Sequence, residues 1–135
     1  MERSYIGRCL CRAVRYECGP LLYPPTLCHC ESCRRAAGAP AVGWLTVRRS
    51  DVHWSGASPR EFESSPGVHR GFCERCGTPL TYRCQQRPGE LDLTIGSLEQ
   101  PAMAAPVDHI WMQDATPWDR PGDGLPQHPA GRRVS

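Results

Sequence analysis

The chain has 135 residues, a length typical of one domain, and 39% of them are hydrophobic. Its 14 prolines and 13 glycines favour short strands and many turns over long helices. The 16 basic and 14 acidic residues give a formal charge of only +2, and no stretch approaches the roughly 20 apolar residues of a membrane span, so we expect neither a nucleic-acid nor a membrane partner.

Short apolar or alternating segments, separated by Gly and Pro, predict a mainly β chain. In chain order, the predicted strands are 13–16, 42–47, 52–54, 61–63, 79–84, 91–95 and 109–112. The segment 31–37 is the single predicted helix, ended by Gly38 and Pro40. We expect one domain over residues 1–126 and a disordered tail over 127–135, where Pro and Gly are frequent.

Seven of the nine cysteines fall into three tight clusters. The clusters are a C-x-C at Cys9 and Cys11, a C-x-C-x-x-C at Cys28, Cys30 and Cys33, and a C-x-x-C at Cys73 and Cys76. Gaps of one or two residues suit metal binding better than disulfide bonds, and the total is odd. The first ten residues contain no apolar run typical of a signal peptide. We therefore expect a reduced, cytoplasmic, zinc-binding chain.

The number of cysteines in each set predicts two kinds of zinc site. In a strand, residues i and i+2 face the same side, so each C-x-C presents both sulfurs to one metal. In the C-x-x-C turn, Gly77 can supply the positive φ that closes the loop. Four thiolates from Cys9, Cys11 and the C-x-x-C would close a structural site, whereas the C-x-C-x-x-C leaves a coordination position open, as catalytic zinc requires. With both sites filled, the net charge becomes about −1.

Other assignments of these ligands remain open at this point. In one alternative, a single metal is shared by the C-x-C and the C-x-C-x-x-C, and the C-x-x-C belongs to another site. Cys18 and Cys84 are alternative fourth ligands, although each ends a predicted strand and buried cysteine is a common small core residue. His29 lies between two ligands, so its side chain is expected to point away from the metal. We expect it either to contact the ligands from outside the coordination sphere or to lie on the surface.

The cysteine clusters and their neighbours resemble the GFA family, the glutathione-dependent formaldehyde-activating enzymes. The resemblance is carried by GRCLCRAVRYEC (7–18), CHCESCRRAAGAP (28–40), FCERCGTPLTYR (72–83), LDLTIGSLEQP (91–101), DHIWMQD (108–114), PWD (117–119) and DGLP (123–126). It implies an all-β tent of small packed antiparallel sheets with one short helix, stabilised by zinc. The family usually has Gly after the second cysteine, where this chain has Arg12, so the local turn is in doubt.

The resemblance also implies an activity. The family's name-giving reaction joins glutathione and formaldehyde into S-(hydroxymethyl)glutathione and is classed with the carbon–sulfur lyases. It implies two zinc ions per chain, a structural one on Cys9, Cys11, Cys73 and Cys76 and a catalytic-type one on Cys28, Cys30 and Cys33, with a thiol such as glutathione and an aldehyde as partners. The alternatives are a non-catalytic zinc module that binds another protein and a methionine-sulfoxide reductase.

Candidate substrate-binding residues follow from the charges of glutathione. Arg34 and Arg35 directly follow the third cysteine of the central motif and are expected to bind carboxylates. Trp44 and Trp111 are expected to wall the pocket. His109 is the expected general acid or base, because the ordinary pKa of histidine lies near neutrality.

Overall fold

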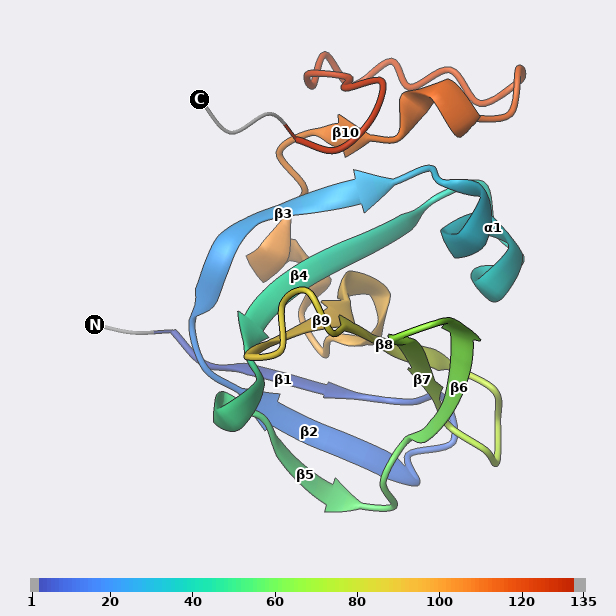
Figure 1. Ribbon diagram of the computed structural model, residues 1–135. Coiled ribbons are helices and arrows are strands. Elements are labelled where there is room, and N and C mark those ends of the chain that lie inside the picture. Colours follow the sequence, from blue (N-terminus) through green and yellow to red (C-terminus); the bar gives the residue numbers. More distant parts are fainter. Residues whose placement is uncertain (1–2, 133–135) are drawn as a thin grey trace.

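A computed structural model describes residues 3–132 of the protein. The chain forms two β-sheets, one of three strands and one of seven, with a single short α-helix at one end (Figure 1). The mainly β class predicted from the sequence is confirmed. Within residues 3–132, no helix is long and apolar enough to cross a membrane.

The smaller sheet has the antiparallel order β1-β2-β5. Its strands are Tyr5–Arg8, Val14–Cys18 and His53–Gly56. In β2, alternate residues are buried, as expected for a strand with one face on the core. Gly7 is paired with Tyr16, and a Cβ at position 7 would lie 2.2 Å from the tyrosine ring, so only glycine fits this position.

The larger sheet has the order β10-β3-β4-β9-β8-β7-β6 and is antiparallel except for the β10–β3 pair. Its strands are β3 (Leu21–Cys28), β4 (Val42–Arg48), β6 (Arg60–Ser65), β7 (Val68–Phe72), β8 (Pro79–Cys84), β9 (Glu90–Thr94) and β10 (His109–Ile110). Short 3₁₀ helices occupy Arg49–Asp51, Ile95–Ser97, Pro101–Ala104 and Met112–Asp114.

The core lies between the two sheets. Leu45, Leu80 and Leu93 are fully buried from the large sheet, and they pack in one cluster with Tyr16 of the small sheet. The Tyr16 hydroxyl is 2.6 Å from the Ser97 hydroxyl, so its buried oxygen has a partner. The core also includes buried cysteines that belong to the metal-binding clusters, which couples packing directly to metal binding.

The helix α1 (Glu31–Ala37) and strand β8 have the predicted limits. Helix α1 ends where Gly38 adopts φ 63° and its N–H bonds back to Arg34 O. Three strands were not predicted: β1, β3 and β7. In β3, Pro24 and Pro25 lie beside register shifts against β4, which is how a strand accommodates residues that cannot donate a ladder hydrogen bond.

The C-terminal segment corrects the prediction of a disordered tail over 127–135. Residues 127–132 lie alongside β10, where His128 N donates to His109 O and Trp111 N donates to Ala130 O. Arg132 Nε donates to a carboxylate oxygen of Asp108 at 2.7 Å. These contacts anchor the segment next to the large sheet (Figure 1). Residues 133–135 lie outside the described part of the chain.

Candidate metal centres and the adjoining pocket

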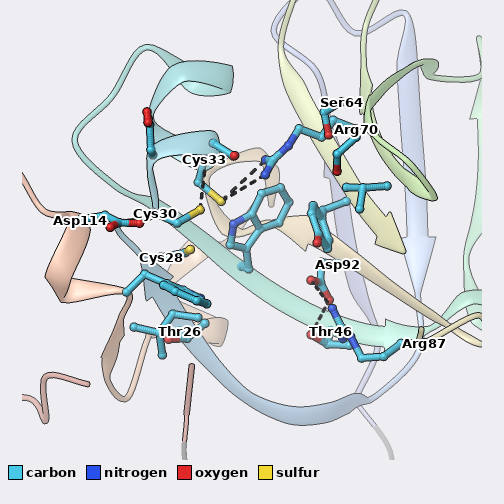
Figure 2. A pocket seen from close by; sticks show the side chains of 18 residues that line it. Thr26, Cys28, Cys30, Cys33, Thr46, Ser64, Arg70, Arg87, Asp92 and Asp114 are labelled. Atoms are coloured by element: carbon cyan, nitrogen blue, oxygen red, sulfur yellow. Dashed lines mark hydrogen bonds and ion pairs between the residues drawn. The ribbon is translucent and has the colours of Figure 1, made fainter. Parts of the chain in front are cut away.

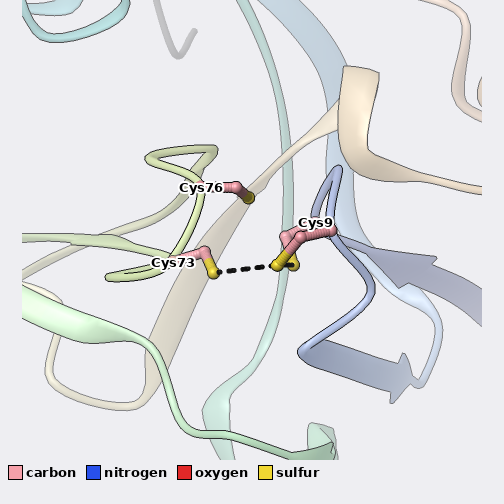
Figure 3. A group of neighbouring side chains, drawn as sticks. Cys9, Cys73 and Cys76 are labelled. Carbon is pink, nitrogen blue, oxygen red and sulfur yellow. Dashed lines mark hydrogen bonds between the residues drawn. The ribbon is translucent and has the colours of Figure 1, made fainter.

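The first centre joins two loops that are far apart in sequence. The Sγ atoms of Cys9, Cys11, Cys73 and Cys76 all lie within 4.8 Å of one another (Figure 3). Cys11 Sγ is 3.6 Å from Cys9 Sγ and 3.8 Å from Cys73 Sγ. Four sulfurs placed about 2.3 Å from a tetrahedral zinc are about 3.8 Å apart, so the donor set fits zinc.

Both loops of this centre contain a left-handed residue. Gly77 has φ 81°, as predicted for the C-x-x-C turn, and its N–H donates to Cys73 O at 2.7 Å. Arg12 has φ 71°, a left-handed conformation that favours glycine. The turn is therefore formed although arginine adopts this conformation with strain. Cys9 and Cys11 both precede Arg12 in the loop after β1, and they are not in a strand as predicted.

Hydrogen bonds to sulfur prepare the first centre for metal binding. Val14 N donates to Cys9 Sγ at 3.3 Å. The Thr78 hydroxyl lies 3.1 Å from Cys76 Sγ, and bonds from the Thr78 hydroxyl and backbone lower the pKa of Cys76 to about 5. A lowered thiol pKa favours the thiolate, which is the form that binds metal.

The second centre is built from one short stretch of chain. Cys28 ends β3, Cys30 precedes α1, and Cys33 lies in its first turn. Their Sγ atoms lie within 4.8 Å of one another. Cys30 Sγ accepts the N–H of Cys33 at 3.3 Å, so the residue that caps the helix also belongs to the centre. The fold therefore brings together one group of four thiols and one group of three. It does not bring the C-x-C near the C-x-C-x-x-C, as the alternative assignment requires.

Arg70 of β7 provides a positive charge beside the second centre. Its Nη1 and Nη2 each donate to Cys33 Sγ at 3.7 Å (Figure 2). Its guanidinium also lies 5.0 Å from the ring centroid of Tyr82. The pKa of Cys30 is lowered, first by hydrogen bonds from Cys28 and Cys33 and further by the charge of Arg70.

A cavity of about 510 Å³ opens directly beside the three thiols (Figure 2). All three cysteines line it. Among its other walls are Trp44 and Tyr82, the cations Arg70 and Arg87, and the acids Glu31, Asp92 and Asp114. Asp114 and Arg70 both line the cavity, and in the view of Figure 2 they lie on opposite sides of the thiols. The site is thus an open three-thiol cluster in a pocket with both charged and apolar walls, large enough for a small molecule.

The comparisons with known proteins agree with this geometry. Residues 4–114 match the profile of the family described as glutathione-dependent formaldehyde-activating enzyme. The chain belongs to this family. An uncharacterized lyase of Schizosaccharomyces pombe is 31% identical over 81 residues, which are 58% of this chain and 57% of that protein, so the match spans little more than half of the relative.

The fold of this family member is also found in a crystal structure of a Rhodobacter sphaeroides protein. The TM-score is 0.60 at 25% identity, and the similar region covers 70% of this chain and 87% of the other. The similarity therefore includes most of that protein.

Only two of the four predicted substrate-binding residues line the pocket. Trp44 and Trp111 line the pocket. Arg34 and Arg35 do not, and Arg35 is exposed and paired with Glu31 at 3.5 Å. The cations of the pocket are instead Arg70 from β7 and Arg87 from the loop after β8, neither of which was predicted. The sequence offers no local signal for either, because both come from segments distant from the central cysteine motif.

His109 is buried behind the centre and does not line the pocket. Its Nδ1 lies 2.9 Å from Nε2 of His29, and its Nε2 lies 2.7 Å from a carboxylate oxygen of Asp123. His29 points away from the thiols, as expected, but it is buried and not on the surface; Asp119 Oδ2 lies 3.0 Å from its Nδ1. Burial lowers the pKa of His29. Through these contacts, the two rings connect the loop that contains Asp119 and Asp123 to the ends of β3 and β10.

The other cysteines are not part of either centre. Cys18 is buried in the core, where burial raises the pKa of its thiol to about 11. Cys84 is partly exposed at the end of β8. Neither lies in the pocket beside the second centre.

Proposed function

We propose that the protein is a carbon–sulfur lyase that forms and breaks the adduct of glutathione with formaldehyde, S-(hydroxymethyl)glutathione. The observation that carries the proposal is the three-thiol cluster that lines a pocket of about 510 Å³. Three protein ligands leave one coordination position for a substrate, as in catalytic zinc sites. Membership of the family supports the same type of reaction.

The two centres have different roles in this proposal. Cys9, Cys11, Cys73 and Cys76 hold a structural zinc, and Cys28, Cys30 and Cys33 hold the zinc of the reaction. Cys28, Cys30 and Cys33 would hold this zinc, which would lower the pKa of a substrate thiol at the open coordination position. Thiols must stay reduced to bind metal, which supports a reducing compartment such as the cytoplasm.

The charges in the pocket match those of glutathione, which has two carboxylates and one ammonium group. Arg70 makes no ion pair with any residue in the described part of the chain, so its guanidinium is available to a substrate carboxylate. Arg87 is already paired with Glu90 and Asp92, which makes it the weaker of the two cations. On the opposite side, Asp114 is placed to accept the ammonium group.

Proton transfer is assigned to Tyr82 in place of His109. The phenol lines the pocket, and burial raises its pKa, so it carries its proton at neutral pH. It donates this proton to the aldehyde oxygen as the carbon–sulfur bond forms. The thiol proton passes to water in the open pocket, and water returns a proton to the Tyr82 phenolate, so the reaction has no net proton change. Tyr82→Phe should slow the reaction by about 10²–10⁴ with little change in glutathione binding.

Exchange NMR between free glutathione and its formaldehyde adduct tests the proposal, because it measures formation and breakdown at equilibrium. The wild type with two zinc ions per chain should accelerate exchange over the solution rate, and Cys30→Ser should remove the acceleration. Cys84→Ser, a cysteine in neither centre, is the matched control. No acceleration by a protein that holds both zinc ions would overturn the proposal and favour a non-catalytic zinc module.

A further inference from the structure

A second cavity of about 380 Å³ lies next to the second centre, with Cys33 among its lining residues. Its walls come from α1 and the strands β4, β6, β7 and β8, and they are mainly apolar. Ala37, Val42, Phe62, Phe72 and Pro79 are among the residues that line it. No part of the reaction proposed above uses this space.

Three residues line both cavities: Cys33, Trp44 and Arg70. Cys33 belongs to the three-thiol cluster, and Figure 2 shows Arg70 in contact with its sulfur. The two cavities therefore adjoin at the three-thiol cluster. A substrate whose sulfur lies at the cluster has a cavity with several charged walls beside it, and the mainly apolar chamber of the second cavity next to that one.

The apolar chamber is far larger than formaldehyde requires. One water occupies about 30 Å³ in the liquid, and formaldehyde is of comparable size. Formaldehyde also carries only hydrogens on its carbon, so it has no group that would enter an apolar chamber. Phe62, at the chamber, is 63% exposed, which leaves a large apolar side chain for a ligand to cover.

We propose that this second cavity binds the apolar substituent of a larger aldehyde, so that the protein acts on glutathione adducts of aliphatic or aromatic aldehydes. The inference rests on the proposed function and specifies its aldehyde. In the step, a lone pair of the thiol sulfur forms the bond to the carbonyl carbon. The π electrons of the carbonyl group move to its oxygen and form a bond to a proton. One proton lost by the thiol thus balances the one gained by the oxygen. The product is a hemithioacetal, and nothing is oxidised or reduced.

The chain length of the aldehyde gives a quantitative test. Each methylene removed from water contributes about 0.8 kcal/mol, a factor of about four in affinity. Hexanal has four methylenes more than acetaldehyde, so its KM should be about 200-fold lower if the chain enters the cavity. Exchange NMR with glutathione and formaldehyde, acetaldehyde or hexanal, in protein with both zinc ions bound, provides these values.

Two substitutions fill the cavity and leave all three cysteines in place. Ala37→Leu, and independently Ala36→Leu at an exposed position of α1, should raise the KM for hexanal at least 10-fold and leave that for acetaldehyde unchanged. Ala102→Leu is the matched control, because Ala102 is exposed and lines neither cavity. A direct binding measurement accompanies the kinetics: 1-hexanol titrated into the ¹⁵N-labelled protein should shift the amides of Ala37 and Phe72.

The outcomes separate the inference from the function on which it rests. Lower KM for hexanal, lost in both filled variants, supports the inference. Equal KM values for acetaldehyde and hexanal, in a protein that still accelerates exchange, would overturn the inference and leave the lyase function standing. Amide shifts by 1-hexanol that are confined to other surfaces would have the same meaning. No acceleration with any of the three aldehydes would overturn the function and the inference together.

Discussion

The two cysteine centres offer the same ligand chemistry but are built from the chain in different ways. The four-cysteine centre joins a loop after β1 to the turn before β8, so it links the two sheets. The three-cysteine centre is contained in one segment at the end of β3 and the start of α1. One centre connects distant parts of the fold, and the other presents thiols to a cavity.

Burial does not distinguish the centres. Cys9 and Cys73 are buried in the first centre, but Cys11 is exposed and Cys76 partly exposed. In the second centre Cys28 and Cys33 are buried, as one would expect of a structural site. The ligand number and the adjoining cavity separate the two, because a fourth protein thiol closes the coordination sphere and a third leaves it open.

The largest expected difference is between Cys76→Ser and Cys30→Ser. A structural zinc contributes roughly 10–16 kcal/mol in zinc-finger peptides, as much as the whole stability of a typical domain. Cys76→Ser should therefore unfold the protein at 25 °C, whereas Cys30→Ser should keep the fold and lose one zinc. Circular dichroism and zinc content by elemental mass spectrometry measure both effects. Equal unfolding by the two variants would show that both metals are structural.

Arg70→Met should weaken metal binding at the three-cysteine centre alone. The guanidinium donates to Cys33 Sγ and offsets the negative charge of the thiolates. Loss of such an outer contact to a ligand typically lowers metal affinity about 10–100-fold. Chelator competition should then show one weakened zinc and one unchanged zinc per chain. Arg60→Met, which removes an exposed arginine paired with Glu74, is the control; the same loss there would contradict the assignment.

Arg132→Ala should destabilise the C-terminal segment that lies alongside β10. The pKa of Asp108 is lowered because hydrogen bonds from Arg132 and Thr26 outweigh the opposing effect of burial. This contribution is complete above the ordinary pKa of the carboxyl group and is lost as pH falls through the lowered pKa. Urea unfolding should show a loss of about 1.5–3 kcal/mol that is constant from pH 6 to 8.

The matched variant for this test is Arg120→Ala, which removes an exposed arginine bonded to a backbone carbonyl. It should change the stability little. A loss of similar size in both variants would mean that the Asp108 contact has no special importance for the segment.

The smallest expected effect concerns the turn of the four-cysteine centre. Arg12 holds a left-handed conformation that costs a non-glycine residue roughly 1–2 kcal/mol. Arg12→Gly should therefore raise the free energy of unfolding by about 1 kcal/mol, with zinc content unchanged. Leu10→Gly, in the same loop but without a positive φ, should lower it. A loss of stability in Arg12→Gly would show that the arginine side chain contributes more than its backbone strain costs.

Sequence reasoning succeeded where the signal is local. Gly38 and Pro40 mark the end of α1, and the cysteine spacings identify the metal-binding thiols. It failed where distant strands decide the outcome. The two prolines of β3 argue against a strand, yet pairing with β4 on one side and β10 on the other keeps it in the sheet.

The arginines show the same limit within the site. Arg34 follows Cys33 directly, but successive residues of a helix point about 100° apart, so adjacency in sequence does not place both at one pocket. Arg70 lies 37 positions after Cys33 and reaches it only because the large sheet folds that strand against α1. No pattern in the neighbourhood of Arg70 indicates this contact.

The span of the four-cysteine centre has a consequence for how the chain is made. Cys11 and Cys73 are 62 residues apart, and ribosomes add roughly 5–20 residues per second, so the first loop waits about 3–12 s for its partner. The central motif emerges during this interval with all three thiols close together in the chain. The three-cysteine centre therefore has all its thiols on the chain while the four-cysteine centre still lacks two of its own.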